Sequence, residues 1–365
     1  MKNILIYRPD NIGDAVLFSG ALKHIRGLYP ESCITLAVQN HICELFEFCP
    51  HINKCVPLER LDWVRSTKYP LFVRWIQSAQ SFFNSHFNTF DLVVFPVKTP
   101  QIEHLKHLYR LKYRNVVGIS GGYKINPDIG CPARLAPENL CKKTLDVSGD
   151  DSMKHEFMTT IDFLKLLGCS LVSTGDVIPE LWLSPSDRCL LENEHMVGRK
   201  LVGLFPGAAI SYRNWAVANY EILAREVHED IGYVLFGGKE DRDLAGGVKK
   251  ALQKGNASCD VLNFVGQTSL RELCAAVKCC DLFVAMETSG LHLAIAMGIP
   301  TIGIVGGGHY GRFVPWGDLK KNVFLTKNLD CFNCGWICTR DRVECIQDVS
   351  PLKVSESING MLGNL

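Results

Sequence analysis

The sequence predicts an α/β protein built from two Rossmann-like domains, each with a parallel sheet covered by helices. Short apolar runs typical of buried strands alternate with amphipathic helical stretches, which is the order of elements that a parallel sheet requires. A less regular segment at 169–185 interrupts this alternation, which then begins again. The length of 365 residues also favours two domains over one. We therefore place the domain boundary near residues 170–197.

Each element of the first half follows from its local pattern. A helix is expected where Leu17, Ala21 and Ile25 form one apolar stripe at helical spacing. Strands are expected where apolar and β-branched residues follow one another without a polar break. The expected elements of this half are strands 3–7, 33–38, 91–95 and 115–119, and helices 15–26 and 153–167.

The second half repeats the pattern. Ser269 and Glu272 have the S-x-x-E spacing of a capping box, so a helix is expected to begin after Ser269. The nearly apolar run 291–308 contains Pro300 and several glycines, so it predicts a helix, a turn and a strand in place of a membrane span. The other expected elements are strands 201–205, 233–236, 282–286 and 301–305, and helices 219–229 and 241–250.

Composition narrows the class of protein. The chain is 47% hydrophobic and 21% charged, which is ordinary for a globular protein, and its net charge of +1 gives no global reason to expect nucleic-acid binding. The N-terminal residues lack the apolar region of a secretory signal. We therefore expect a cytoplasmic protein whose 16 cysteines are mostly small buried hydrophobes, without a disulfide framework.

The most informative stretch is 281–317, where a buried strand is followed by a polar turn and a short helix. Ligands of open α/β sheets bind beyond the carboxyl ends of the strands, where helix N-termini offer free N–H groups to anions. We expect a phosphorylated ligand there. The candidate residues are Glu287, Thr288, Ser289, Gly290 and His292.

Two further strand-end loops of the second half suit the same ligand. After strand 201–205, Gly207 permits close approach of the backbone, and Ser211 and Arg213 can donate hydrogen bonds to phosphate. After strand 233–236, Gly238 and Glu240 can approach a ribose. Alternatively, Arg213 and Glu240 are ordinary solvated residues. Together the three loops predict a nucleotide site, although neither G-x-x-x-x-G-K-[ST] nor G-x-G-x-x-G is present.

In the first half, Gly13 and Asp14 occupy the first strand-to-helix turn. Asp14 is either a helix-capping residue or a general base, because a carboxylate at a helix N-terminus stays ionised. Basic residues could bind an anionic acceptor or simply form a solvated helix face. The acceptor candidates beside Gly13 are Lys98, Arg110 and Arg114.

Three other features also leave alternatives open. Cys331, Cys334, Cys338 and Cys345 are either ligands of Zn²⁺ or a similar soft metal, or buried free thiols. The aromatic segment 69–90 is either a core helix or a surface for a lipid-linked acceptor. The pair Asp150–Asp151 is either a cation ligand or solvated, and solvation is the commoner case.

Taken together, these stretches resemble glycosyltransferase family 9, the ADP-heptose:lipopolysaccharide heptosyltransferases and their relatives. The resemblance rests on the stretches IYRPDNIGDAVLFSGALKHIR, FPGAAISYRNW and FVGQTSLRELCAAVKCCDLFVAMETSGLHLAIAMGIPTIGIVG, together with the tail CFNCGWIC. It implies the GT-B fold, with two Rossmann-like domains facing across a cleft. Residues 1–180 would bind the acceptor, 198–326 the nucleotide-sugar, and 327–365 would form a cysteine-containing tail with a terminal helix.

The resemblance also implies an activity and roles for residues. The reaction would be inverting and metal-independent, with no cofactor for catalysis and at most a structural Zn or Fe in the tail. Asp14 matches the catalytic base. Arg213 stands where a Lys usually contacts the diphosphate, Thr288, Ser289 and Gly290 match the phosphate-binding turn, and His292 matches its following histidine.

The implied partners are a nucleotide-sugar donor, with ADP-heptose as the default, and a lipid-linked acceptor of the lipopolysaccharide core or a related surface glycan. Peripheral contact with the inner membrane would follow from such an acceptor. Glu287 stands where the family often has Asp, and Ala216 follows Trp215 where Pro is usual. Two alternatives stay open, a protein O-heptosyltransferase and a non-catalytic nucleotide-sugar-binding protein.

Overall fold

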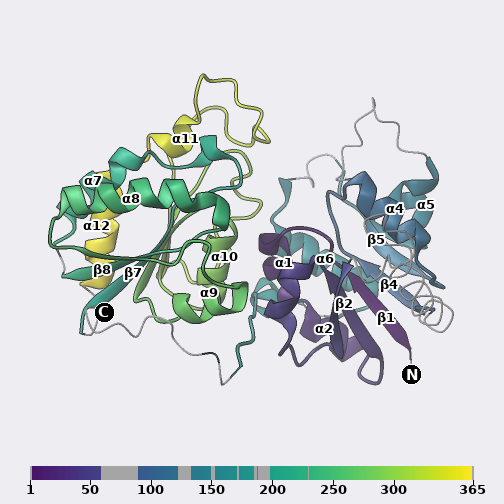
Figure 1. Ribbon diagram of the computed structural model, residues 1–365. Coiled ribbons are helices and arrows are strands. Elements are labelled where there is room, and N and C mark those ends of the chain that lie inside the picture. The colour runs from purple at the N-terminus through teal and green to yellow at the C-terminus, as the bar shows by residue number, and fades with distance from the viewer. Residues whose placement is uncertain are drawn as a thin grey trace, which may run out of the picture. The chain divides into compact units, whose positions relative to one another are not determined.

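The computed structural model describes residues 2–58, 89–121, 133–148, 153–170, 172–184, 187, 198–228 and 230–363. The chain forms two compact units, Met1–Trp182 and Leu183–Leu365 (Figure 1). Most of the aromatic segment 69–90, and both Asp150 and Asp151, lie outside the described residues.

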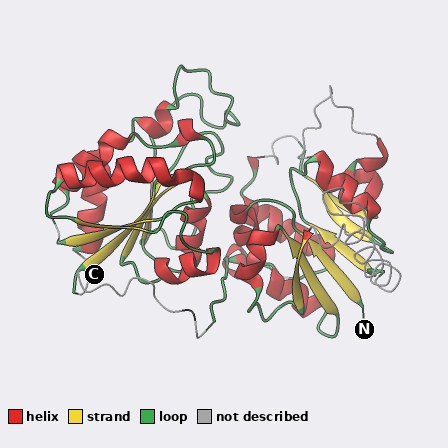
Figure 2. Cartoon of the chain, in the orientation of Figure 1, coloured by secondary structure: helices red, strands yellow, loops and turns green. Residues whose placement is uncertain are grey.

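The first unit contains a parallel six-stranded sheet in the order β3-β2-β1-β4-β5-β6 (Figure 2). Its strands are β1 (Asn3–Tyr7), β2 (Cys33–Val38), β3 (Lys54–Pro57), β4 (Leu92–Phe95), β5 (Val116–Ser120) and β6 (Lys143–Asp146). Its α-helices are α1 (Ile12–Ser19), α2 (Leu22–Leu28), α4 (Ile102–Arg110), α5 (Pro137–Leu140) and α6 (Glu156–Leu167). The central strands are buried apolar runs, as a parallel sheet covered on both faces requires.

The second unit repeats this topology, with the strand order β12-β11-β10-β7-β8-β9. Its strands are β7 (Lys200–Phe205), β8 (Ile231–Leu235), β9 (Asp260–Asn263), β10 (Leu282–Met286), β11 (Thr301–Ile304) and β12 (Asn322–Leu325). Its α-helices are α7 (Val217–Glu226), α8 (Arg242–Gly255), α9 (Leu270–Val277), α10 (Ser289–Ala296), α11 (Glu344–Gln347) and α12 (Pro351–Leu362). The expected fold class, two parallel α/β sheets, is confirmed.

In each sheet the direction in which successive strands are added reverses between two neighbouring strands, β1 and β4 in the first sheet and β7 and β10 in the second. In the first unit β1 pairs with β2 on one side and β4 on the other, and in the second unit β7 pairs likewise with β8 and β10. Successive right-handed crossovers therefore pass to opposite faces of each sheet, which opens a crevice at the carboxyl ends of the two central strands. The loops after β1 and β4, and after β7 and β10, lie at these two switch points.

The cysteine-containing tail is part of the second unit. Val354, Ile358 and Leu362 of α12 are fully buried in the same hydrophobic core as the strands of the second sheet. The buried Trp215 indole also donates a hydrogen bond from Nε1 to the carbonyl oxygen of Val349, at 2.9 Å. Residues before α12 are thereby fixed against the loop that follows β7.

The single helix expected over 15–26 is in fact two helices, α1 and α2, which are separated at Gly20. The carbonyl oxygens of Val177 and Ile178 approach Gly20 so closely that a Cβ there would lie about 2.4 Å from them. The Ser19 hydroxyl also accepts a hydrogen bond from the Glu180 backbone N–H at 2.8 Å. A returning segment of the same unit thus packs against the break between the two helices.

Most of the described cysteines are free thiols, as expected, but only four of these are buried and the larger number are partly exposed. Cys49, Cys259, Cys274 and Cys280 are buried free thiols, and burial raises the pKa of the Cys280 thiol to about 12. Cys279 is the exception among the described cysteines, because it is disulfide-bonded. The structure therefore contains buried thiols of the expected kind together with at least one disulfide.

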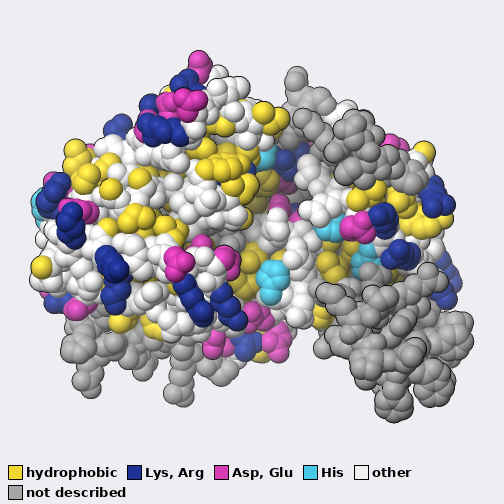
Figure 3. All heavy atoms as spheres, turned by 45° about the horizontal axis from the view of Figure 1, so that its top comes forward, with side chains coloured by type: hydrophobic (Ala, Val, Ile, Leu, Met, Phe, Trp, Pro, Cys, Tyr) yellow, Lys and Arg dark blue, Asp and Glu magenta, His cyan; other side chains and the backbone are white. Residues whose placement is uncertain are grey.

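The surface carries charges of both signs. On the face drawn in Figure 3, Lys and Arg side chains lie interspersed with Asp and Glu over the described residues, in keeping with the net charge of +1. None of the helices in the described ranges is long and apolar enough to cross a bilayer.

Candidate functional site

Glu287 lies at the switch point of the second sheet, directly after β10. Its Oε2 accepts a hydrogen bond from the Gly306 backbone N–H at 2.9 Å, which ties the end of β10 to the glycine-rich loop after β11. Withdrawal from water raises the pKa of the Glu287 carboxyl from 4.5 to about 7. The Gly306 hydrogen bond and the positive charge of Arg213 act in the opposite direction but are the smaller effects.

The N-terminus of α10 follows at the same point. Thr288 is the N-cap residue and Ser289 begins the helix, so the first N–H groups of α10 are directed toward the crevice. A Cβ at Gly290 would lie 2.5 Å from the Phe205 ring, so this glycine lets α10 pack closely on β7. His292 is buried, and its Nδ1 accepts a hydrogen bond from Trp316 Nε1 at 3.0 Å.

The loops after β7 and β8 meet around Asp241. A Cβ at Gly207 would lie 2.2 Å from the Asp241 carboxylate, and the Gly238 backbone N–H donates to that carboxylate at 2.9 Å. Only residues without a side chain fit beside Asp241, which explains the glycines at the ends of these strands. Glu240 is exposed in the same turn.

Ser211 and Arg213 form a short 3₁₀ helix in the loop after β7, where Ser211 is exposed. The Arg213 guanidinium lies 3.7 Å from the centroid of the Trp336 ring, so it is stacked on the indole. Its Nε is buried and has no hydrogen-bond partner within the described residues. Arg213, Glu287 and the N-terminus of α10 thus belong to loops that converge at one switch point.

The first unit has candidate site residues of its own in the turn that follows β1. Gly13 and Asp14 lie in the first turn of α1, and Asp14 is partly exposed. Arg8 is buried, donates to the Asp14 backbone carbonyl at 3.1 Å and also bonds the carbonyl of Pro96 after β4. Arg8 thereby fixes the loop of β1 to that of β4 and holds the turn that carries Asp14.

Lys98 is buried beside this turn, after β4. Its Nζ donates to the Lys154 carbonyl at 3.0 Å and lies 3.8 Å from Glu156 Oε1, so the ammonium is engaged within the unit. Asp10 is also withdrawn from water, which raises the pKa of its carboxyl although the positive charge of Arg8 opposes this. The switch point of the first sheet is therefore a partly buried, charged site.

The other two acceptor candidates lie elsewhere. Arg110 is exposed in the last turn of α4. Arg114 precedes β5, so it lies at the edge of the sheet opposite to Asp14, where it pairs with Asp91 Oδ1 at 3.4 Å. Arg114 lines a separate hollow of about 500 Å³ together with Lys2, Lys142 and Lys143. Arg114 is therefore not part of the site that contains Asp14.

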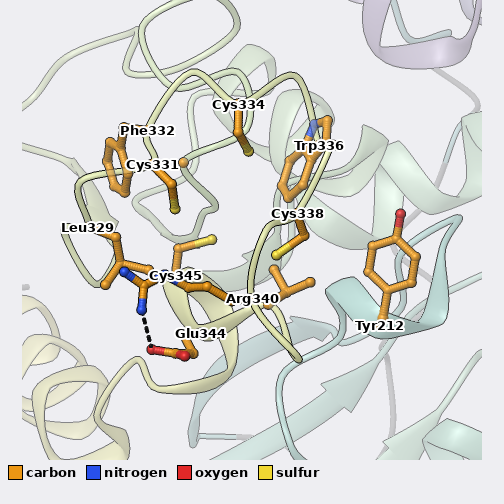
Figure 4. A pocket seen from close by; sticks show the side chains of 12 residues that line it. Tyr212, Leu329, Cys331, Phe332, Cys334, Trp336, Cys338, Arg340, Glu344 and Cys345 are labelled. Atoms are coloured by element: carbon orange, nitrogen blue, oxygen red, sulfur yellow. Dashed lines mark hydrogen bonds and ion pairs between the residues drawn. The ribbon is translucent and has the colours of Figure 1, made fainter.

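The four tail cysteines line one small cavity of about 20 Å³ (Figure 4). Their sulfur atoms point toward a common space, and Tyr212 and Trp336 line the same cavity. Burial, followed by the neighbouring thiols, raises the pKa of Cys345. In the described residues, however, no three His, Cys, Asp or Glu side chains are close enough together to hold a metal ion. A metal site in the tail is thus not supported by the geometry.

Comparisons with known proteins agree with this arrangement. A model of glycosyltransferase family 9 (heptosyltransferase) matches residues 171–336. Lipooligosaccharide heptosyltransferase 2 of Campylobacter jejuni is 28% identical over 171 residues, which is 46% of this chain and 52% of that protein. The matched region thus spans about half the length of that curated relative.

Solved structures match over the whole chain. The glycosyl transferase family 9 protein of Veillonella parvula has a TM-score of 0.77 at 16% identity and covers 100% of this chain and 98% of its own. E. coli ADP-heptose lps heptosyltransferase II has a TM-score of 0.68 at 17% identity, with 100% and 99% covered. The two Rossmann-like units are those of the GT-B fold. The resemblance to glycosyltransferase family 9 is confirmed.

Three residues of these sites were not among the sequence-based candidates. Asp241 and Arg8 hold the loops in place, and Trp336 stacks on Arg213. Asp241 follows a Gly-Gly pair at the start of a helix, and Trp336 is a large aromatic residue between two cysteines. Both signals were visible, but neither reveals the residue it contacts.

Proposed function

We propose that this protein is an inverting glycosyltransferase that moves a sugar from a nucleoside-diphosphate sugar to a glycan acceptor. The observation that carries the proposal is the convergence of Arg213, Glu287 and the N-terminus of α10 at one switch point. A guanidinium and free helix N–H groups are the donors that a leaving diphosphate needs. ADP-heptose as donor and a lipopolysaccharide-core acceptor are favoured by the similarity to a lipooligosaccharide heptosyltransferase and to an ADP-heptose lps heptosyltransferase.

In the proposed reaction, an acceptor hydroxyl oxygen attacks the anomeric carbon of the donor sugar. Asp14 takes the hydroxyl proton, the bond from the anomeric carbon to the diphosphate oxygen breaks, and the electron pair leaves with the nucleoside diphosphate. Attack from the face opposite the leaving group inverts the configuration. We assign the stabilisation of the negative charge that develops on the leaving diphosphate to Arg213 and the N–H groups at Thr288–Gly290. Transfer therefore needs no metal ion in this proposal.

Asp14→Asn tests the assigned base. The substitution keeps the size of the side chain and removes its ability to take a proton, so kcat is expected to fall by about 10² to 10⁴ while donor affinity is retained. Radiolabelled sugar transfer and calorimetric titration with donor measure the two quantities. Asp176→Asn, at a partly exposed capping carboxylate of the first unit, is the control that should leave both unchanged. Unchanged transfer by Asp14→Asn would show that another group is the base.

A donor screen tests the substrate. Thermal unfolding is measured with ADP-, GDP-, UDP- and CMP-sugars, because a ligand that binds the native state raises the unfolding temperature. We expect the largest rise with the ADP-sugar. The acceptor is then identified with lipopolysaccharide-core and protein substrates in parallel, since transfer to protein alone would indicate a protein O-heptosyltransferase. Donor binding without transfer to either acceptor would favour a binding protein.

A second proposal concerns the cysteine cavity. An iron-containing heptosyltransferase, TibC, is among the structural neighbours, with a TM-score of 0.50 at 12% identity. In the structure no three of these thiols are close enough together to hold a metal ion, but all four line one cavity, and cysteine thiolates are ligands that suit Zn²⁺ and iron. We propose that Cys331, Cys334, Cys338 and Cys345 hold one structural metal ion when their sulfur atoms close around it.

Metal analysis of the purified protein tests this proposal. About one equivalent of metal is expected in the natural protein and much less in Cys334→Ser. Cys259→Ser, at a buried thiol outside the cavity, is the matched control and should keep the metal. A metal content as low in the natural protein as in Cys334→Ser would refute the proposal.

A further inference from the structure

Arg213 has one neighbour that determines where its guanidinium lies. The Trp336 ring is 3.7 Å from the guanidinium carbon, whereas the Tyr212 ring is 6.0 Å away. Arg213 Nε is buried and lacks a hydrogen-bond partner within the described residues. The planar cation is therefore positioned by its stacking on the indole face more than by hydrogen bonds through Nε.

Trp336 is itself firmly held. Its Nε1 donates to His309 Nδ1 at 3.2 Å, and its ring covers Gly306 and Gly308 so closely that a Cβ at either glycine would lie 2.4 Å from a ring atom. The Trp336 backbone has a φ of +65°, a left-handed conformation that is uncommon for a residue with a bulky side chain. Such a conformation persists only where the surroundings impose it.

Two backbone hydrogen bonds of the tail impose this left-handed conformation on Trp336. The Asn333 and Gly335 N–H groups donate to the carbonyl oxygens of Gly307 and Gly308 at 2.7 and 3.0 Å. These two hydrogen bonds fix the tail to the glycine-rich loop, the same loop whose Gly306 N–H holds Glu287. Trp336 therefore contacts both the cation and the loop that define the diphosphate side of the site.

We infer that Trp336 is a positioning residue for Arg213, through which the cysteine-bearing loop 331–338 sets the affinity for the donor diphosphate. This inference rests on the proposed function, because it requires Arg213 to contact the diphosphate. Trp336 lies between Cys334 and Cys338 and lines the cysteine cavity with them (Figure 4). One indole ring thus separates that cavity from the arginine.

A double-mutant cycle between Trp336 and Arg213 tests the inference. Dissociation constants for ADP and for inorganic pyrophosphate are measured by calorimetry for the natural protein, Trp336→Leu, Arg213→Gln and the double variant. Trp336→Leu should weaken binding about tenfold, equivalent to about 1.4 kcal/mol, when Arg213 is present. In the Arg213→Gln background the same substitution should have little effect, because no guanidinium remains to be positioned.

Two further variants separate positioning from general stability. Trp336→Phe retains an aromatic face and should restore most of the affinity lost in Trp336→Leu. Phe332→Leu removes the neighbouring aromatic ring, which covers Gly307 and contacts the Tyr310 ring at a tilt, and it should leave the affinity within about twofold. Thermal unfolding of each variant reports whether the second unit remains folded.

The outcomes distinguish the inference from the proposed function. If Arg213→Gln leaves binding unchanged, the assignment of Arg213 to the diphosphate is wrong, and the inference fails with it. If Arg213→Gln weakens binding but Trp336→Leu does not, the proposed function stands and only the positioning role is refuted. Equal losses from Trp336→Leu in both backgrounds would show that Trp336 acts on the fold alone.

Discussion

Replacing Glu287 by Gln should make the protein more stable at alkaline pH. The folded protein holds this carboxyl with a pKa of about 7, against 4.5 for the ordinary side chain, because the carboxylate is withdrawn from water. The native state therefore binds more protons than the unfolded state between these two pH values, and the free energy of unfolding falls as pH rises through that window. The loss slows at the folded pKa of about 7 and is complete about one pH unit above it.

The size of the effect follows from the two pKa values. A difference between 4.5 and about 7 corresponds to about 3 kcal/mol at about 1.4 kcal/mol for each pKa unit. This figure is an upper value, because the side chain is only partly buried and solvent screens it. Gln keeps an oxygen that can accept from the Gly306 N–H but does not ionise, so the variant should lack the pH-dependent loss.

Urea unfolding between pH 4.5 and pH 8.5, followed by tryptophan fluorescence, measures this difference. The free energy of unfolding of Glu287→Gln, minus that of the natural protein, should rise by up to about 3 kcal/mol across the range. Glu356→Gln, at an exposed position of α12, is the matched control and should follow the natural protein throughout. Parallel pH profiles for Glu287→Gln and the natural protein would refute the assigned burial.

Two other substitutions test the loops around the candidate donor site. Gly207→Ala places a Cβ 2.2 Å from the Asp241 carboxylate, so it should displace Asp241. We expect ADP binding, measured by calorimetry, to weaken by about tenfold or more. An affinity equal to that of the natural protein would contradict the close packing of Gly207 on Asp241. Trp215→Phe leaves the buried Val349 carbonyl without its donor and should lower the free energy of unfolding by about 1 to 3 kcal/mol. An unchanged midpoint of urea unfolding would show that this hydrogen bond is dispensable.

The strands that could be predicted from the sequence are the interior ones. Every strand with neighbours on both sides was expected from its apolar run, whereas the edge strands β3, β6, β9 and β12 were not. An edge strand pairs on one side and is partly exposed, so it needs no continuous apolar stretch. β6, for example, begins with Lys143 and ends with Asp146, both exposed.

The part of the candidate site that could be predicted is the part that the strand order of the sheet determines. Gly207, Gly238 and Glu287 come directly after strands of a parallel sheet, so their approach to one edge follows from the sheet alone. The contacts of Trp336 with Arg213 and with the glycine-rich loop depend on how an irregular tail folds back. No periodic pattern encodes such a contact. Arg114 was grouped with the acceptor candidates for its charge alone, and it lies before β5, at the edge of the sheet opposite to Asp14.

The burial of α12 has a consequence for how the protein is made. Because Val354, Ile358 and Leu362 complete the core of the second unit, that unit cannot finish folding until Leu362 has left the ribosome. The first unit draws its strands and helices from residues before Trp182 and is free to fold earlier during synthesis. During that interval the apolar strands β10 and β11 lack the cover of α12, which makes it the stage of synthesis most open to aggregation and to recognition by chaperones.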